Sequence, residues 1–342
     1  MSIKRSAILS VVVFLIALYP VNIFAQRGGG SRNTIEVKIA SPLPRDSPWG
    51  KTLDQIGAEW SRITNGEVRP RILHNGQEGG EGKMITSLSS NNIQTGLFTS
   101  FGISTIYPPI MTLSVPFLIR DDAELDAVLK EILPQMDAQV NKTDYVIIAW
   151  SKVGWVNVFS KDPVMVPNDL RRMKIATNAE TKDLNTVFKT MGFQMVETEI
   201  TDTGTKVVSG AINSIYNNPA AVAAFQLHQS LKNMMSMPIA PAMGAIVMNR
   251  VTWNKISPAS QQAILSTTRR IAQNFDASVT QNNTNAIQSM VRGGLIVNRP
   301  TAANEELWRA EIERALPPLL GTTFDRDVYQ KINDVLTAYR NR

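Results

Sequence analysis

The segment "SPASQQAILSTTRRIAQNFDASVTQNNTNAIQSMVR", residues 257–292, decides the fold, because nothing after Pro258 interrupts a helix. Ser257 followed by Pro258 is typical of a helix start, and no further proline and no glycine occurs before Arg292. At about 1.5 Å per residue, these 36 residues would span roughly 50 Å, more than one small domain needs. Five apolar residues fall near one stripe of this helix: Ile264, Ile271, Phe275, Ile287 and Val291. We therefore predict one long helix that joins two lobes.

The middle of this segment is its weakest part. Residues 275–286, "FDASVTQNNTNA", are polar and include few strong helix formers. A bend or a break there is the alternative to one continuous helix.

Strands and helices alternate along the rest of the chain. In "TIEVKIA", residues 34–40, every second residue is apolar, which is typical of a strand with one buried face. Residues 49–63 have helical spacing, with Ser47 and Pro48 before them and Gly66 after them. Further strands are predicted at 67–73, 93–99, 144–150, 156–160, 173–177, 193–197, 211–216 and 245–249, and a last helix at 324–339. This alternation predicts an α/β fold.

Composition argues against several kinds of site. The chain has no cysteine, which excludes disulfides, thiolate metal sites and a cysteine nucleophile. It has only two histidines, so we expect neither a metal site nor a cofactor. The formal net charge is +6, and no basic run is interleaved with aromatic residues. Nucleic acid is therefore not an expected partner.

The first 25 residues have the pattern of a secretory signal peptide. Lys4 and Arg5 precede an apolar run over residues 7–18, and Ala25 offers a small residue at a cleavage point. We expect residues 26–33 to form a flexible linker. The alternative is an uncleaved membrane anchor, but the run is short for a span of about 20 residues. A lipoprotein needs a cysteine after the cleavage point, so we expect a periplasmic protein with no lipid anchor.

Five further sequence blocks are informative because of the order in which they occur along the chain. They are "TNGEVRPRILHNGQEGGEGKMITSLSSNNIQTGLF" (64–98), "LSVPFLIRDDAELDAVL" (113–129), "VGWVNVFSKDPVMVPNDLRRMKIAT" (153–177), "VVSGAINSIYNNP" (207–219) and "VMNRVTWNKISP" (247–258). In this order the chain resembles the extracytoplasmic solute-binding proteins of TRAP transporters, of the C4-dicarboxylate-binding type. The resemblance implies two α/β lobes, joined by a long helix, that close around one small ligand. It also implies delivery of that ligand to a sodium-coupled membrane permease.

The expected architecture is thus a two-lobe periplasmic-binding-protein fold with a ligand cleft between the lobes. About 310 residues follow the signal peptide, more than one core comfortably holds. We assign residues 34–154 and 244–282 to lobe 1. Residues 155–243 and 283–342 are assigned to lobe 2.

Two positions depart from the pattern of the family. In its members the strand after a "D-L-(R/K)-G-(L/M)-K-I" turn typically ends in an arginine that pairs with the ligand carboxylate. The matching stretch here is "DLRRMKIATN", residues 169–178, and the arginine position is Ala176. A second basic position, in a block that usually reads Gly-aromatic-Arg, corresponds to Val156. The chain therefore resembles a branch without the anchoring arginine, whose planar fork matches a carboxylate.

A carboxylate buried without a paired cation would cost several kcal/mol of desolvation. We therefore expect a neutral or hydrophobic ligand in a mostly apolar cleft with a few polar fixing points. The expected ligand-binding residues are Phe98, Trp150, Trp155, Asn157, Ala176, Asn178, Tyr216, Asn217 and Met243. Two alternatives are a core position for Phe98 or Trp150 and a turn at Asn217. Another is that a relocated arginine, Arg45 or Arg172, still binds a carboxylate.

The expected function is that of the periplasmic solute-binding component of a TRAP transporter. Its partners would be a small ligand and the membrane permease subunits. The alternative is a docking protein with a degenerate cleft, for which a periplasmic helical-repeat protein is a candidate partner. An enzyme comes third, because no catalytic constellation is visible in the sequence.

Secretion should remove residues 1–25, because Ala25 completes the signal pattern. N-terminal sequencing of the secreted protein should then begin at or close to Gln26. A secreted protein that still begins at Met1 would contradict this prediction.

Overall fold

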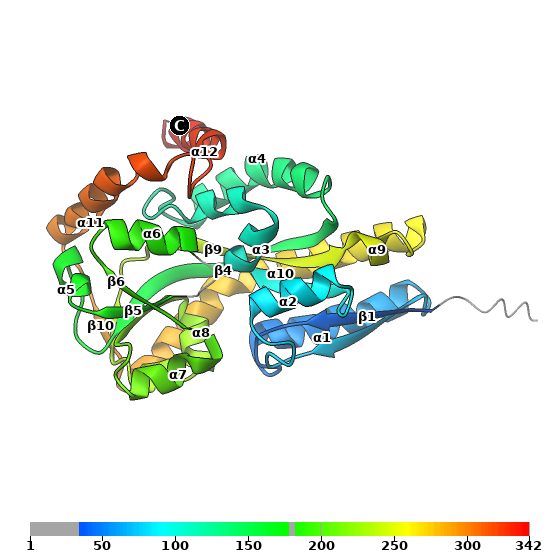
Figure 1. Cartoon of the computed structure of the whole chain (residues 1–342), viewed down its shortest axis with the longest axis horizontal. Helices are drawn as coiled ribbons and strands as arrows, with labels where there is room; N and C mark the ends of the chain where they lie inside the picture. Colours follow the sequence, from blue (N-terminus) through cyan, green and yellow to red (C-terminus); the bar gives the residue numbers. More distant parts are fainter. Residues whose placement is uncertain (1–33, 178–181, 199, 342) are drawn as a thin grey trace, which may run out of the picture. The chain divides into compact units, whose positions relative to one another are not determined.

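The structure is a computed structural model that describes residues 34–177, 182–198 and 200–341. The predicted signal peptide (1–25) and linker (26–33) lie outside the described residues. The described chain has the predicted α/β architecture, in which helices surround a mixed sheet of ten strands (Figure 1). The strands are β1 (Ile35–Ala40), β2 (Val68–Leu73), β3 (Thr95–Thr99), β4 (Tyr145–Ser160), β5 (Lys174–Thr177), β6 (Gln194–Glu197), β7 (Ser214–Asn217), β8 (Asn233–Met235), β9 (Ala240–Asn249) and β10 (Ile296–Asn298).

One strand, β4, divides the sheet into two groups of strands. The order is β2-β1-β3-β9-β4-β7-β5-β6, and β8 pairs with β4 and with β10. Residues 145–156 of β4 pair antiparallel with β9, whereas residues 157–160 pair antiparallel with β7. The separate strands predicted at 144–150 and 156–160 are therefore one strand, whose register shifts between Lys152 and Gly154. We call β1, β2, β3 and β9 the first strand group, and β5, β6, β7, β8 and β10 the second.

Most helices begin at a side chain that caps the first turn. Ser47, Asp121 and Ser257 each accept a hydrogen bond from the backbone N–H three residues ahead, which satisfies a donor that the helix leaves unpaired. The helices are α1 (Pro48–Ile63), α2 (Glu81–Ser89), α3 (Ser100–Ile106), α4 (Asp122–Val140), α5 (Pro167–Arg171), α6 (Lys182–Thr190), α7 (Ile200–Val208), α8 (Pro219–Ala224), α9 (Arg250–Trp253), α10 (Pro258–Arg292), α11 (Ala302–Ala315) and α12 (Arg326–Arg340). Short 3₁₀ helices are η1 (Pro108–Ser114), η2 (Leu227–Gln229) and η3 (Pro317–Leu319).

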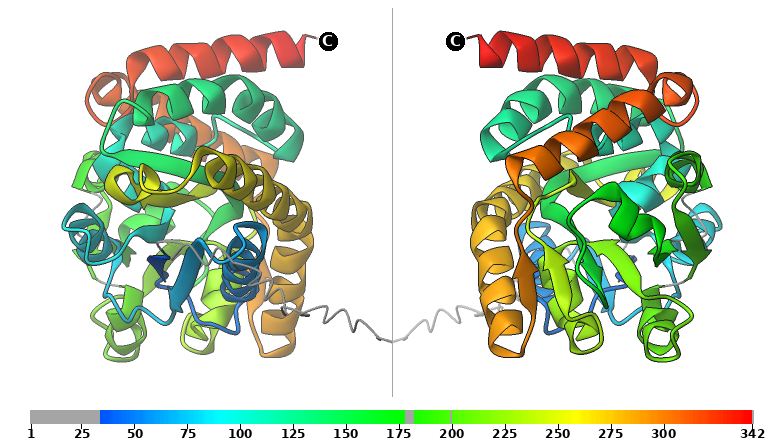
Figure 2. Two further views of the ribbon diagram at one scale, coloured as in Figure 1. Left: turned by 90° about the vertical axis from the view of Figure 1, so that its right-hand side faces the viewer. Right: turned by 90° about the vertical axis from the view of Figure 1, so that its left-hand side faces the viewer.

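The long helix α10 is continuous through the polar stretch where a break was the alternative (Figure 2). Tertiary contacts offset the weak helix propensity of this stretch, because α10 packs against α1, β4 and α8. The Trp60 indole of α1 donates a 2.7 Å hydrogen bond to Thr268 of α10. Ile264 and Ile271 are buried as predicted, but Val291 is 45% exposed, so its place on the buried stripe was wrong.

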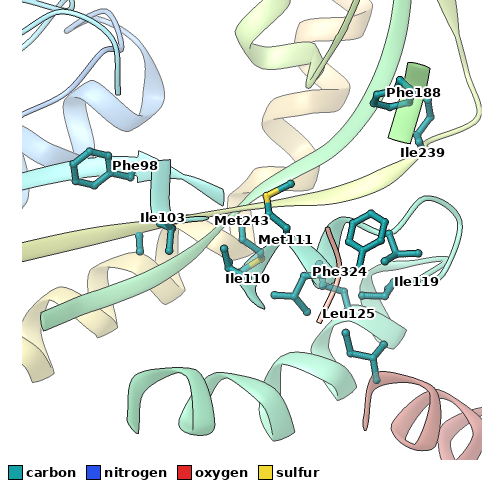
Figure 3. Packing of buried hydrophobic residues seen from close by; sticks show 14 of the residues in the cluster. Phe98, Ile103, Ile110, Met111, Ile119, Leu125, Phe188, Ile239, Met243 and Phe324 are labelled. Atoms are coloured by element: carbon teal, nitrogen blue, oxygen red, sulfur yellow. The ribbon is translucent and has the colours of Figure 1, made fainter. Parts of the chain in front are cut away.

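The buried side chains form three clusters. One packs α1 and α10 against the first strand group, with Leu53, Trp60 and Ile264 at its centre. The largest runs from β3 and β9 to the C-terminal helices, and Figure 3 shows Met243 drawn between Phe98 and Phe188. The third packs α7, α8 and the end of α10 against β7 and β8. The hydrophobic cores therefore bring together segments that are far apart in the sequence.

The C-terminal helix α12 is tied to α4 by an ion pair. Arg340 contacts both carboxylate oxygens of Glu124, at 2.7 and 2.8 Å, and donates to the Leu118 carbonyl oxygen at 3.0 Å. The Glu124 side chain is only 6% exposed. Burial alone would raise the pKa of Glu124, but hydrogen bonds from Arg340 and the Arg120 amide outweigh it and hold the pKa below its ordinary value.

Replacement of Arg340 by Met should lower the free energy of unfolding by roughly 2–3 kcal/mol near neutral pH, because it leaves a buried carboxylate without its cation. A lowered pKa stabilises the fold above the unfolded pKa, so the loss should shrink as the pH falls below about 4. Urea unfolding at several pH values measures this. The control is Arg314→Met, which removes an arginine with a 74% exposed side chain and should cost less than about 1 kcal/mol. Equal losses in the two variants would contradict the prediction.

Candidate functional site

A cavity of about 270 Å³ is lined by residues from both strand groups. The first group contributes Phe98 and Thr99 of β3 and residues 241–244 of β9. The second group contributes Ala176 and Thr177 of β5 and residues 215–217 of β7. Strand β4, helices α1, α2, α3, α6, α7, α8 and α10, and the loop before α1 contribute further lining residues. The volume is close to the lower end of the range for ligand pockets, so the cavity suits a small molecule.

Most of the predicted site residues meet at this cavity. Phe98, Ala176, Tyr216, Asn217 and Met243 all line it, although they come from four strands. The parallel strands β5 and β7 are adjacent, and Ala176 pairs with Ile215, the residue before Tyr216, so all three lie near the carboxyl ends of these strands. Asn178 lies outside the described residues.

Three predicted residues are described but lie outside the cavity lining: Trp150, Trp155 and Asn157. The Trp150 indole donates to Asp137 at 2.6 Å, and the Trp155 indole donates to Asp122 at 2.8 Å. Both carboxylates belong to α4, so the two tryptophans attach this helix to β4. The buried Asn157 amide donates to the Met235 carbonyl oxygen at 3.1 Å, which holds the end of β8.

Sequence reasoning missed the contribution of α10. Phe275, Val279, Asn282 and Asn283 line the cavity, and all four lie within the stretch 275–286 that was interpreted as the weak part of the helix. The mixture of aromatic, β-branched and amide residues in this stretch was the available signal. Residues 275–286 depart from a plain amphipathic pattern because one face of the helix contacts the cavity there.

Gly154 shows how closely α10 approaches β4 beside the cavity. Its φ of 111° lies in a region that side chains rarely adopt, and a Cβ atom there would lie 2.3 Å from the Asn283 amide nitrogen. The Asn283 side chain accepts from the Ala220 N–H at 3.1 Å and donates to the Val279 carbonyl oxygen at 3.1 Å. One asparagine of α10 thereby contacts β4 and α8 together.

Both positions where the resemblance implies an arginine line the cavity with an apolar side chain. These are Ala176 of β5 and Val156 of β4. Arg45 is 67% exposed and pairs with Asp54 at 2.9 Å, and Arg172 is exposed at the end of α5. Within the described part of the chain, the cavity lining contains no arginine, lysine or histidine.

The aromatic wall of the cavity is electrically neutral. The Tyr216 ring packs against Phe188 in an edge-to-face arrangement with 5.7 Å between ring centroids. Burial raises the pKa of the Tyr216 hydroxyl above its ordinary value, so the hydroxyl stays protonated. Asn218 caps α8 by accepting from the Ala221 N–H at 2.8 Å.

A carboxylate of α10 joins the helix to β4 next to the cavity. Asp276 accepts hydrogen bonds from the Ser151 hydroxyl and, at 2.9 Å, from the Lys152 N–H. The Lys152 side chain pairs with Asp126 of α4. Burial raises the pKa of Asp276 to about 6, and the negative charge of Asp126 adds to this, although both hydrogen bonds and the Lys152 charge act against it.

The described residues offer neither a metal site nor a membrane-spanning helix. No group of three or more histidine, aspartate or glutamate side chains among them is arranged to hold a metal ion. None of their helices combines the length and the apolar character needed to cross a membrane.

A small-molecule cavity lined from two strand groups, with a long helix beside it, defines a solute-binding protein. The chain belongs to the DctP family, "Bacterial extracellular solute-binding protein, family 7", whose model matches residues 39–319. A "Solute-binding protein" of Verminephrobacter eiseniae is 22% identical over 273 residues, 78% of this chain and 79% of the relative. The Escherichia coli "2,3-diketo-L-gulonate-binding periplasmic protein YiaO" is 24% identical over 239 residues, 68% of this chain and 72% of the relative.

Solved structures of TRAP periplasmic solute-binding proteins share the fold. One from Ralstonia eutropha, with bound (S)-2-acetolactate, has a TM-score of 0.83 at 19% identity and covers 89% of this chain and 99% of its own. Another from Chromohalobacter salexigens, with bound D-glucuronate, has a TM-score of 0.81 at 17% identity and covers 88% and 99%. The predicted periplasmic-binding-protein fold with a long helix is thus confirmed. The family and these neighbours are transport proteins and not enzymes.

Replacement of Asp276 by Asn should change how stability depends on pH. A carboxyl group with a raised pKa stabilises the fold fully below its unfolded pKa of about 4, and this contribution is lost as the pH rises through the folded value of about 6. The asparagine variant does not ionise, so its free energy of unfolding relative to the wild type should rise by roughly 2–3 kcal/mol between about pH 4 and pH 7.

Thermal and urea unfolding across this pH range measure the difference. The control is Asp46→Asn, which removes a carboxylate from an exposed loop. A constant difference between Asp276→Asn and the wild type across the range would refute the prediction.

Proposed function

We propose that the chain is the periplasmic component of a TRAP transporter that binds a small neutral or hydrophobic ligand in the cavity and delivers it to a membrane permease. The family membership supports the transport role. The single observation that carries the ligand class is the apolar side chain at both arginine positions, Ala176 and Val156, in a lining with no described cation.

The cost of desolvation decides which ligands such a cavity can hold. A carboxylate that leaves water loses several kcal/mol of hydration, and a buried guanidinium normally restores this through two parallel charge-assisted hydrogen bonds. Alanine and valine offer methyl groups instead. The neighbours with D-glucuronate and (S)-2-acetolactate hold carboxylates, and the proposal is that this chain differs from them in ligand class.

The two strand groups correspond to the proposed lobes. Residues 34–154 with 244–282 form lobe 1, and residues 155–243 with 283–342 form lobe 2. Only β4, β9 and α10 continue from one proposed lobe into the other, so these three elements would carry a hinge motion. Closure would bury the ligand between Phe98 of lobe 1 on one side and Ala176, Tyr216 and Met243 of lobe 2 on the other.

The alternatives receive less support. Arg45 is already paired with Asp54 on the surface, which does not favour a relocated anchor there. Residues 178–181 and the side chain of Lys182 are not among the described parts of the chain. Nothing in the described residues favours a docking role or a periplasmic helical-repeat partner. The proposal therefore keeps the small ligand and the permease subunits as partners, and the periplasm as the location.

Calorimetric titration of the mature wild-type protein with succinate and malate should give no measurable binding. The double variant Ala176→Arg, Val156→Arg should gain affinity for these dicarboxylates, because each charge-assisted hydrogen bond contributes roughly 1.5–3 kcal/mol, or at least about tenfold. The control is Ala176→Gln, Val156→Gln, which adds polar bulk without charge and should gain nothing. Thermal unfolding of each variant reports whether the fold is intact. Micromolar binding of a dicarboxylate by the wild type would show that another cation has replaced the lost anchor.

A further inference from the structure

Ser114 brings an unpaired hydroxyl group to the cavity. It is the last residue of η1, it lines the cavity, and only 6% of the residue is exposed. Its hydroxyl makes no hydrogen bond to any described residue, yet its oxygen is not among the fully buried side-chain atoms that lack a partner. The accessible surface that this hydroxyl keeps therefore faces the cavity.

The other two serines of the described lining hold the backbone. The Ser47 hydroxyl donates to the Pro44 carbonyl oxygen at 2.6 Å, and the Ser100 hydroxyl donates to the Met243 carbonyl oxygen at 3.1 Å. Ser114 has no such structural bond within the described chain. A polar group in an apolar wall is unfavourable unless water or a ligand pairs with it, so the Ser114 hydroxyl is available to a ligand.

Tyr216 presents a second hydroxyl to the same cavity. This hydroxyl also makes no hydrogen bond to a described residue, and burial is the only cause that raises its pKa. The group keeps its proton and can donate it. The contact between the Tyr216 and Phe188 rings fixes the side chain that carries it.

Both hydroxyls lie at the end of the cavity next to Val156. Phe117, three residues after Ser114, lines a small neighbouring void together with Tyr216. The Phe117 N–H donates to the Ile239 carbonyl oxygen at 2.8 Å, and the Ile239 N–H donates to the Val156 carbonyl oxygen at 2.9 Å. This end of the cavity is thus a place where the family resemblance implies an arginine.

We propose that Ser114, together with Tyr216, donates a hydrogen bond to a carbonyl oxygen of an uncharged ligand. The inference rests on the proposed function, because it names the chemistry of the ligand that the same cavity takes. A carbonyl oxygen has two lone pairs and can accept from both hydroxyls. A carboxylate would still lack a cation here, since a hydroxyl carries no charge.

The two hydroxyls would also reject a ligand that is apolar throughout. Such a ligand expels water from the cavity and leaves both donors unpaired. Sites that hydrogen-bond a ligand discriminate strongly against an analogue that lacks the bonding group.

A matched series of probes tests the proposal on the wild-type mature protein. Acetophenone, α-methylstyrene and benzoate share a phenyl ring and a planar substituent of similar size, which is a ketone, an alkene and a carboxylate. Calorimetric titration should show that acetophenone binds at least about tenfold tighter than α-methylstyrene, and that benzoate binds weakest. Binding of α-methylstyrene that equals or exceeds that of acetophenone would overturn the proposal.

Two variants assign the preference to the hydroxyls. Ser114→Ala should lower the ratio of acetophenone affinity to α-methylstyrene affinity by at least about fivefold. Tyr216→Phe, which keeps the ring against Phe188, should lower the same ratio. A Ser114→Ala protein that folds, shown by a cooperative thermal transition, and keeps the wild-type ratio would overturn the assignment.

The matched control is Ser214→Ala. The Ser214 hydroxyl is buried without a partner, as an unpaired serine of β7, but Ser214 lies outside the cavity lining. This variant should keep the wild-type ratio. If Ser114→Ala does not fold, Ser114→Cys replaces it with a weaker donor of similar size, and the wild-type order of the probes decides if neither variant folds.

The same titrations separate this proposal from the proposed function. If acetophenone and α-methylstyrene bind equally and both bind tighter than benzoate, the apolar cavity stands and the role of Ser114 fails. If benzoate binds tightest, the proposed ligand class fails and the role of Ser114 fails with it. Absence of binding by all three probes would overturn the role of Ser114 and leave the ligand class to the titration with succinate and malate.

Discussion

The shared strand β4 is the constraint on which the rest of the described chain depends. One part of it pairs with β9 and the other with β7, so a single strand carries both strand groups. Its register shifts between Lys152 and Gly154, beside the point where Asp276 holds α10. The approach of α10 to Gly154 is so close that the Asn283 side chain would have to move to admit a side chain at this position. The cavity is formed where these elements meet, and its lining therefore depends on this contact.

The chemistry of the lining follows from which side chains the two strand groups supply. The second group places Ala176 where the family resemblance implies an arginine, and β4 places Val156 at the other basic position. Under the proposed function, an apolar side chain at both positions leaves a carboxylate ligand without the paired cation that would offset its desolvation.

The fold was largely predictable from the sequence because its elements have strong periodicity and clear ends. The helix 258–292 is an example, since the sequence itself shows the capping residue Ser257 and the absence of glycine within the helix. One continuous helix was the prediction, but the weak helix propensity of residues 275–286 left a break as the alternative. The sequence could not decide between them, because contacts with β4 and α8 stabilise that stretch.

The site was predictable only in part. Ala176 and Tyr216 were predictable as cavity residues because they stand near the ends of the neighbouring strands β5 and β7. Trp150 and Trp155 could not be placed from the sequence. The carboxylates that accept hydrogen bonds from their indoles belong to another element, α4, and the register of their own strand, β4, shifts. Glu81 was not among the predicted site residues, and only the fold brings it beside β3.

The decisive measurement is native mass spectrometry of the protein purified from its own periplasm, before and after solvent extraction of the bound small molecule. The proposed function predicts that a neutral or apolar molecule without a carboxylate is released, and that the protein mass falls by the mass of that molecule. Release of a dicarboxylate or a sugar acid would contradict the conclusion that the cavity lacks an anion anchor.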